Sequence, residues 1–312
     1  MAYSLNEINR RCREDAAAYI AECDNDYARR LALAADRIME NLDRSPVVLL
    51  SGPSGSGKTT TAMKICEVLE ERGVRTHSIS MDNYFKTVSP ETTPRTASGA
   101  YDLESPLCLD MDLLNKHFSA LSKGEKIYVP RYDFVHQARL MRYGRALRLK
   151  ENEIVVFEGI HALNDSITDV HPEAFKLYIS ARANIADDEG KIVFKGTWMR
   201  LVRRTVRDYL FRGTQAQQTL ANWANVRRGE KLYISPFKDK ADLQFDSAFA
   251  YEVPVLNNTV TELFAAMPED TPRYQELRSI VPAFALFEDV PADLLADDSL
   301  LREFIGGGKY QY

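Results

Sequence analysis

The fold of this chain is decided by the stretch Gly52-Pro53-Ser54-Gly55-Ser56-Gly57-Lys58-Thr59. It matches the pattern G-x-x-x-x-G-K-[ST], in which glycines let backbone N–H groups curl around phosphate oxygens while a following helix adds its positive end. The apolar run at 47–50 predicts a buried strand before the loop, and residues 60–72 predict a helix after it. A random chain of this length matches the four fixed positions about one time in a hundred, so a chance Gly/Ser turn is the weaker interpretation.

This phosphate loop predicts that ATP is a ligand, with Mg²⁺ beside it. Lys58 is expected to reach the outer phosphates, and the hydroxyl of Thr59 is expected to hold the metal. The residues expected to bind ATP are Gly52, Ser54, Gly55, Ser56, Gly57, Lys58, Thr59 and Thr60.

Composition limits the classes of protein to which the chain can belong. It has 312 residues, 45% of them hydrophobic, which is enough for a full core, and its formal net charge of -5 gives no general attraction to nucleic acid. The four cysteines stand at no metal-binding or redox spacing, and no apolar run approaches the roughly 20 residues of a membrane span. Because the N-terminus also lacks a signal-peptide core, we expect a cytoplasmic protein that binds neither nucleic acid nor membrane.

Strand and helix patterns alternate along the chain. Strands are expected at 47–50, 74–80, 126–130, 154–157, 175–180, 241–248 and 253–256, and helices at 107–121, 197–212 and 215–228. This alternation predicts an α/β fold with a parallel sheet of about five strands and helices on both faces. The expected parts are a helical extension at 1–45 with a break at 24–26, a phosphate-loop domain at 46–257 with a helical lid near 197–230, and a helical extension at 258–312.

Two acids follow strands whose carboxyl ends should lie beside the phosphate loop. Asp82 comes just after the strand at 74–80, and Glu158 closes the strand at 154–157. Ligands of open parallel sheets bind at this edge, where one carboxylate can take a proton from an attacking hydroxyl and another can hold Mg²⁺. We therefore predict Asp82 as the base and Glu158, with Thr59, as the metal ligands. The alternative interpretation is that each acid only lies at the end of a strand, exposed to water and without a functional role.

The helix expected at 197–212 carries a row of arginines. Those that fall on one face, at spacings of three and four, are Arg200, Arg203, Arg204 and Arg207. Surface faces usually mix Lys with Glu. An all-arginine face therefore favours stabilisation of charge on a transferring phosphoryl group over a merely solvated face.

Six motifs, in this order, resemble those of uridine/cytidine kinases, which belong to the wider phosphoribulokinase/uridine kinase group of P-loop kinases. They are the phosphate loop, Met81–Tyr84, Tyr101–Glu104, Tyr132–Phe134, Phe157–Ile160 and Arg203–Asp208. The resemblance covers about residues 46–257. It is closest to a bacterial branch often fused to a small domain that threonyl-tRNA synthetases also contain. That domain is absent from this sequence, whose first residues resemble the linker helices of the branch.

The resemblance implies roles for particular residues. Asp82 takes the position of the catalytic base, and Lys58, Arg207 and Arg212 take those of groups that meet the phosphates of ATP. Thr59 and Glu158 take the magnesium positions. The residues at acceptor positions are Glu104 for the ribose hydroxyls, Tyr132 for the nucleobase, Gln137 at a nucleoside-recognition position, and Arg204 on the substrate side.

Several acceptor positions differ from the uridine kinase pattern. Gln137 stands where that pattern has a histidine, with His136 one place off, Thr214 stands in place of an arginine and Asn222 in place of a glutamine. Glu104 replaces an aspartate and so moves its carboxylate by one methylene. Since a site built to hydrogen-bond one base discriminates strongly against others, these changes predict an altered acceptor and leave the phosphate chemistry intact.

Together these observations predict an ATP- and Mg²⁺-dependent kinase whose acceptor is a hydroxyl of a small sugar-bearing molecule, most simply the 5′-hydroxyl of a nucleoside. Two alternatives stay open. One is a kinase for another alcohol, such as a sugar, a polyol or a pantothenate-like compound. The other is a non-enzymatic nucleotide-dependent switch, although a pure switch would not need Asp82, Glu104 and Tyr132 beside the loop. A homo-oligomer is among the expected states, and the sequence does not select it.

Overall fold

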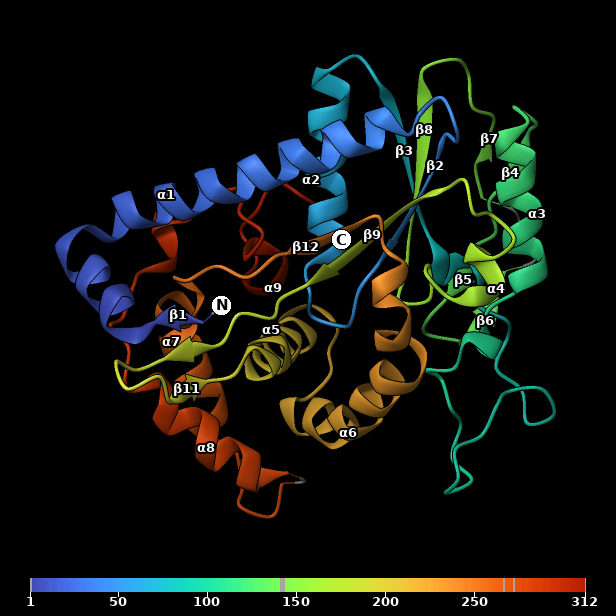
Figure 1. The fold of residues 1–312 in the computed structure, drawn as a ribbon. Coiled ribbons are helices and arrows are strands. Elements are labelled where there is room, and N and C mark those ends of the chain that lie inside the picture. The colour runs from blue at the N-terminus through green and yellow to red at the C-terminus, as the bar shows by residue number, and fades with distance from the viewer. Residues whose placement is uncertain (1, 141–143, 266, 272, 312) are drawn as a thin grey trace.

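A five-stranded parallel sheet forms the centre of the molecule in the computed structural model, which describes residues 2–140, 144–265, 267–271 and 273–311 (Figure 1). Its strand order is β12-β9-β2-β8-β3, and every neighbouring pair is parallel. The strands are β2 (Val47–Ser51), β3 (Arg75–Ser80), β8 (Glu153–Glu158), β9 (Phe175–Ser180) and β12 (Leu243–Asp246). The predicted α/β class and the predicted parallel sheet are therefore confirmed.

Helices cover both faces of this sheet (Figure 1). Alternate residues of β2 point to opposite sides, so Val48 and Leu50 pack with helices α1 (Leu5–Glu40) and α2 (Lys58–Glu71) in one apolar core. Val47 and Leu49 pack with α3 (Met111–Ser122) and α4 (Asp165–Thr168) in the other. β2 is buried along its whole length because it lies between β8 and β9. The phosphate loop that follows it is thus anchored in the middle of the sheet.

Three smaller sheets lie outside the central one. β1 (Tyr3–Ser4), β10 (Ile185–Ala186) and β11 (Ile192–Phe194) form a three-stranded sheet that joins the N-terminal segment to the loop after β9. The two remaining sheets are antiparallel pairs, formed by β4 (Ile127–Tyr128) with β7 (Ala146–Leu147) and by β5 (Tyr132–Asp133) with β6 (Ala138–Arg139).

The later helices gather at the carboxyl end of the sheet. Helix α5 (Gly196–Phe211) and helix α6 (Ala216–Tyr233) lie below the strands in the view of Figure 1. They are followed by α7 (Glu252–Ala265), α8 (Tyr274–Phe284) and the short α9 (Arg302–Ile305). Four 3₁₀ helices complete the described parts: η1 (Met81–Tyr84), η2 (Pro106–Cys108), η3 (Ser235–Lys240) and η4 (Ala292–Leu294). No helix in these parts is long and apolar enough to cross a bilayer.

Two local predictions are wrong. The apolar run at 253–256 is not a strand, because it forms the first turns of α7, in which Val253, Leu256 and Val260 are buried at helical spacing. Such a short apolar run fits a buried helix as well as a strand. The break in the N-terminal helix lies at Asp15 (φ -164°, ψ 92°) and not at 24–26, and the Asp15 carboxylate accepts a hydrogen bond from the Ala18 N–H at 3.0 Å. Asp15 therefore caps the second part of α1.

Candidate active site

The phosphate loop has the backbone that its sequence predicts. Gly55 and Gly57 have φ of 73° and 75°, a region that residues with a Cβ adopt at a cost, and α2 begins directly afterwards at Lys58. Close packing also demands glycine, since a Cβ at Gly52 would overlap the carbonyl of Ile179 at the end of β9. The loop is therefore held between the sheet and the lid, with its N–H groups at the positive end of a helix.

Lys58 lies among three acids at the edge of the sheet. Its ammonium donates a hydrogen bond to the Pro53 carbonyl at 3.2 Å. Burial lowers the pKa of Lys58, and the negative charges of Glu158, Glu303 and Asp82 oppose that shift. The lysine and both predicted strand-end acids thus lie close enough to interact electrostatically.

The two predicted acids reach this place from adjacent strands. β3 and β8 pair in parallel with Ser80 opposite Glu158, and Asp82 lies just beyond Ser80 in η1. Burial raises the pKa of Asp82, and the nearby Lys58 and Arg212 act against this. Burial, followed by the charge of Asp82, raises the pKa of Glu158 to about 7. Two carboxylates therefore share a poorly solvated region with one lysine.

This donor set fits Mg²⁺. The metal prefers hard oxygen ligands and is usually held by one or two carboxylates together with substrate phosphates, and less often by a cage made only of protein. The glutamate at the end of β8 and the hydroxyl of Thr59, in the first turn of α2, are oxygen donors of this kind. No group of three His, Cys, Asp or Glu residues in the described parts of the chain could form a complete cage. A cation here would offset the repulsion that raises the pKa of Glu158.

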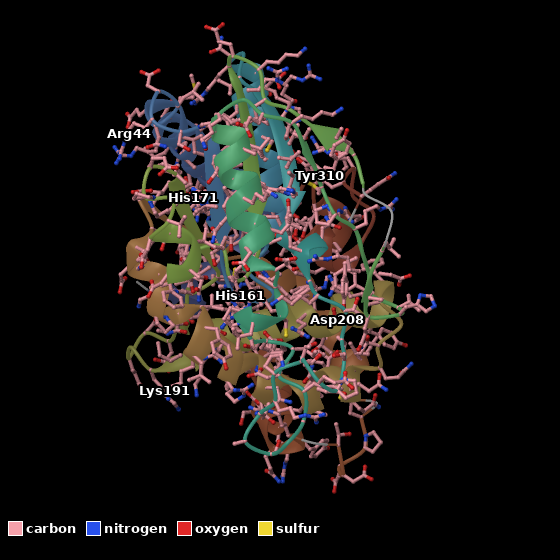
Figure 2. All side chains as sticks on the ribbon, turned by 90° about the vertical axis from the view of Figure 1, so that its right-hand side faces the viewer. Arg44, His161, His171, Lys191, Asp208 and Tyr310 are labelled. Atoms are coloured by element: carbon pink, nitrogen blue, oxygen red, sulfur yellow. The ribbon has the colours of Figure 1, made fainter. Side chains whose placement is uncertain are left out.

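The predicted lid arginines converge on one acid that sequence reasoning did not single out. Asp208, labelled in Figure 2, is buried on α5. It pairs with Arg207 at 2.7 Å, with Arg204 at 3.3 Å and with Arg212 at 3.7 Å. Its position four residues from both Arg204 and Arg212 is the sequence signal that could have identified it. Asp208 therefore holds the three guanidinium groups in one cluster above the loop.

The other two arginines of the predicted face have structural partners. Arg200 donates from its Nη2 atom to both oxygens of the Glu230 carboxylate, at 2.9 and 3.0 Å, and its side chain is almost completely buried. Arg203 is wholly buried and pairs with Glu252 at the start of α7. The prediction that the whole arginine face stabilises a transferring phosphoryl group is therefore wrong for these two residues. Only Arg204 and Arg207 of that face join the cluster around Asp208.

Glu104 and Arg204 lie near each other beside the phosphate loop. Arg204 donates a hydrogen bond to the Ser54 hydroxyl at 2.8 Å, so it links the lid to the phosphate loop. Burial raises the pKa of Glu104, and the charge of Arg204 acts against that shift. Gly229 of α6 packs so tightly on Glu104 that a Cβ there would overlap the glutamate side chain. The Glu104 side chain thus lies between α5 and α6.

A cavity of about 230 Å³ opens beside these groups. Its walls combine the segment after η1, the loop at 87–108 and the β5–β6 hairpin, and include Phe85, Leu103, Tyr132, Phe134 and Gln137. The ring centroids of Phe85 and Tyr132 are 5.6 Å apart, and those of Tyr132 and Phe134 are 5.1 Å apart. The surface of the cavity is therefore mostly apolar, and its walls also carry the polar side chains of Lys86, Thr87, Thr92, Thr93 and Gln137.

The departures from the uridine kinase pattern fall at different places. Gln137 lines the cavity and has a left-handed backbone with φ of 50°. His136 is exposed and contacts the Asp133 carboxylate at 2.8 Å, so it does not take the place of the missing histidine. Asn222 is exposed on α6, and the N–H of Thr214 bonds to the Asp208 carbonyl at 3.1 Å. Of these positions, only Gln137 is a wall of the cavity.

One further acid beside the loop was not predicted from the sequence as a site residue. Glu303 of α9 accepts hydrogen bonds from the Thr60 N–H at 3.3 Å and from the Thr60 hydroxyl at 2.5 Å. Its carboxylate thereby uses two groups of a residue that we predicted to bind ATP. The two residues are 243 positions apart, and no local pattern brings them together.

The sequence of this chain is similar to those of known proteins. Residues 47–253 match the sequence profile of the phosphoribulokinase/uridine kinase family. A uridine kinase of Halobacterium salinarum is 28% identical over 62% of this chain and 76% of its own length, and a uridine kinase of Staphylococcus haemolyticus is 28% identical over 63% and 85%. A uridine kinase of Saccharomyces cerevisiae is also 28% identical, but the match spans only 36% of that longer protein.

A solved structure from Silicibacter, described as a candidate fructose transport system kinase, has a similar fold. Its TM-score is 0.51 at 18% identity, over 69% of this chain and 98% of that one. At this level of identity the likeness concerns the fold alone.

Proposed function

Because the chain belongs to the phosphoribulokinase/uridine kinase family and is a P-loop kinase of that family, we propose that it transfers the γ-phosphate of ATP to a hydroxyl of a small sugar-bearing acceptor. The simplest acceptor is a nucleoside, phosphorylated at its 5′-hydroxyl. The observation that carries the proposal is the position of Asp82 just beyond β3, at the same sheet edge as Glu158 and near enough to Lys58 of the phosphate loop for their charges to interact. A carboxylate so placed suits proton removal from an alcohol.

In the proposed reaction, the acceptor hydroxyl attacks the γ-phosphorus as its proton passes to the carboxylate of Asp82. The bond between the γ-phosphorus and the oxygen bridging to the β-phosphate breaks, and ADP leaves with that oxygen. Lys58, Arg207 and Arg212 stabilise the charge on the phosphoryl oxygens. Thr59 and Glu158 would hold Mg²⁺, which would supply further charge neutralisation.

The cavity beside Tyr132 and the nearby Glu104 favour an acceptor that has a flat apolar part next to its hydroxyl groups. The aromatic cavity beside Tyr132 suits a ring, and Glu104, pinned by Gly229, suits ribose or other vicinal hydroxyls. Gln137 in the cavity wall offers both an amide donor and an acceptor in place of the imidazole of the uridine kinase pattern. This exchange favours an acceptor whose ring or side group differs from uracil.

The test is a coupled assay of ADP release against a panel of nucleosides, sugars and polyols. The Asp82→Asn variant should keep its affinity for ATP and lose roughly 10²- to 10⁴-fold in acceptor-dependent turnover, as is typical when a general base is removed. Asp112→Asn, at an exposed acid of α3, is the matched control and should keep full activity. Full activity of the Asp82→Asn variant would refute the assignment of the base.

A further inference from the structure

The C-terminal segment, residues 300–310, lies directly against the phosphate loop. A Cβ on Gly57 would come within 2.8 Å of the Leu300 side chain, so this leucine packs on the last glycine of the loop. Phe304 is wholly buried, with the guanidinium of Arg203 5.1 Å from its ring centroid. In Figure 2, Tyr310 lies on the same side of the molecule as Asp208 of the lid. The segment is therefore built into the nucleotide end of the molecule.

A cavity of about 320 Å³ lies between this segment and the end of lid helix α5. Its walls include Arg207, Phe211, Arg212, Glu303, the glycines at 306–308 and Tyr310. This volume is at the lower end of the range typical for small-molecule sites. Phe211 as a residue is 55% exposed, and its side chain lines the cavity, which leaves an aromatic surface available to a ligand.

The glycines shape this cavity. Gly306 and Gly307 have φ of 82° and 72°, and a Cβ on Gly306 would come within 2.8 Å of the Phe211 ring. The backbone can therefore pass close to the aromatic ring, and no side chain of these residues fills the space beside it.

The cavity adjoins the phosphate site and is separate from the acceptor cavity. Glu303 both lines it and contacts Thr60 of the loop. Arg207 and Arg212 line it, and their charges reach Lys58 and Asp82 respectively. The cavity beside Tyr132 shares none of these wall residues. The two cavities are therefore separate, and the one beside Phe211 adjoins the loop through Glu303.

We propose that the cavity beside Phe211 receives the nucleoside half of the donor nucleotide, and that the innermost phosphate of the nucleotide replaces Glu303 on Thr60. The inference rests on the proposed function only in taking the loop as a nucleotide site. Phe211 offers a ring on which a base can stack, and the backbone of the glycine segment offers polar groups for its edge.

Replacement of Glu303 follows from the chemistry of Thr60. The N–H groups of a phosphate loop and of the first turn of its helix bind phosphate oxygens. Here the carboxylate of Glu303 accepts hydrogen bonds from the N–H and from the hydroxyl of Thr60. A carboxylate and a phosphate cannot use the same donors, and their negative charges repel each other. Binding of the phosphate at Thr60 must therefore displace the Glu303 carboxylate.

The plainer interpretation is that residues 300–310 only seal the core and that Glu303 only caps α2. The two interpretations make opposite predictions for Glu303. A simple cap would make its removal harmful to folding and neutral for nucleotide affinity. A competitor for the phosphate position would make its removal favourable for nucleotide affinity.

The first experiment measures binding of ATP and of inorganic tripolyphosphate to the full chain by calorimetry. Phe211→Ala should weaken ATP binding about tenfold, the size expected for one lost base–aromatic contact, and leave tripolyphosphate affinity unchanged. Leu210→Ala, the matched control at an exposed neighbour that does not line the cavity, should leave both affinities unchanged. Unchanged ATP affinity in Phe211→Ala, or an equal loss for both ligands, would overturn the proposed cavity.

The second experiment uses Glu303→Gln, which keeps the shape of the side chain and removes its charge. Both ATP and tripolyphosphate should bind about tenfold more tightly, because a neutral amide competes less well for Thr60. Glu303→Asp, whose shorter side chain reaches Thr60 less easily, should shift both affinities in the same direction and serves if the glutamine variant does not fold. Unchanged or weaker binding in the folded variant would overturn the replacement of Glu303.

These outcomes separate the inference from the proposed function. If the wild-type chain binds ATP and responds to Phe211→Ala but phosphorylates no acceptor, the inference stands and the kinase assignment fails. If the wild-type chain binds no ATP, both fail.

Discussion

Replacing Arg203 by methionine should destabilise the fold strongly and change nucleotide affinity far less. The guanidinium donates to the Glu252 carboxylate, to the Ser247 carbonyl at 3.0 Å and to the Gly55 carbonyl at 3.3 Å. Its side chain is 0% exposed and that of Glu252 is 1% exposed. The arginine therefore joins α5, the start of α7 and the phosphate loop in one buried network.

The magnitude follows from this burial. Removing one partner of a buried ion pair typically costs about 3–5 kcal/mol, because the remaining charge is left without compensation. Burial already raises the pKa of Glu252, so this carboxyl can take up a proton once Arg203 is gone and relieve part of the penalty. At neutral pH we therefore expect a loss near the lower limit, about 3 kcal/mol in the free energy of unfolding. The loss should shrink as the pH falls and Glu252 becomes neutral.

Urea denaturation monitored by circular dichroism measures the loss of stability, and calorimetry with ATP under native conditions measures affinity. The double variant Arg203→Met/Glu252→Gln should recover part of the stability, because it leaves no buried charge. Glu252→Gln alone tests the same network if the methionine variant does not fold. An Arg203→Met protein with wild-type stability and lost ATP affinity would refute the reasoning. It would show instead that Arg203 acts in phosphate binding.

Two further predictions concern the acceptor and the metal. In steady-state assays, Gly229→Ala should raise the KM for the acceptor about tenfold and leave the KM for ATP unchanged. The reason is that the added methyl group displaces Glu104, at a cost typical of overpacking. Equal effects on both constants would contradict this prediction. Since the pKa of Glu158 is raised to about 7, its carboxyl is increasingly protonated below that pH and ionised above it. Apparent affinity for Mg²⁺, measured through Mg²⁺-dependent ATP binding, should fall about tenfold per pH unit below pH 7 and level off above it, and Glu158→Gln should abolish that slope.

Much of the sheet, and of the sheet edge that carries the candidate site, could be predicted from the sequence. The strand, glycine loop and helix around Lys58 are adjacent in the chain, so local rules are enough to predict them. Asp82 and Glu158 were predicted to lie at one edge because parallel strands present their carboxyl ends together, and the pairing of Ser80 with Glu158 brings them there. These features depend on short-range patterns and on one general property of parallel sheets.

The partners of the charged side chains were decided only by the tertiary structure. Helical spacing predicted that Arg203 and Arg207 lie on one face. It could not predict that Arg203 pairs with Glu252 of α7, whereas Arg207 pairs with Asp208. The contact of Glu303 with Thr60 joins residues 243 positions apart, which no period in the sequence encodes. The physical reason is that local patterns fix which way a side chain points. The partner of a charged side chain depends on which distant segment packs against it.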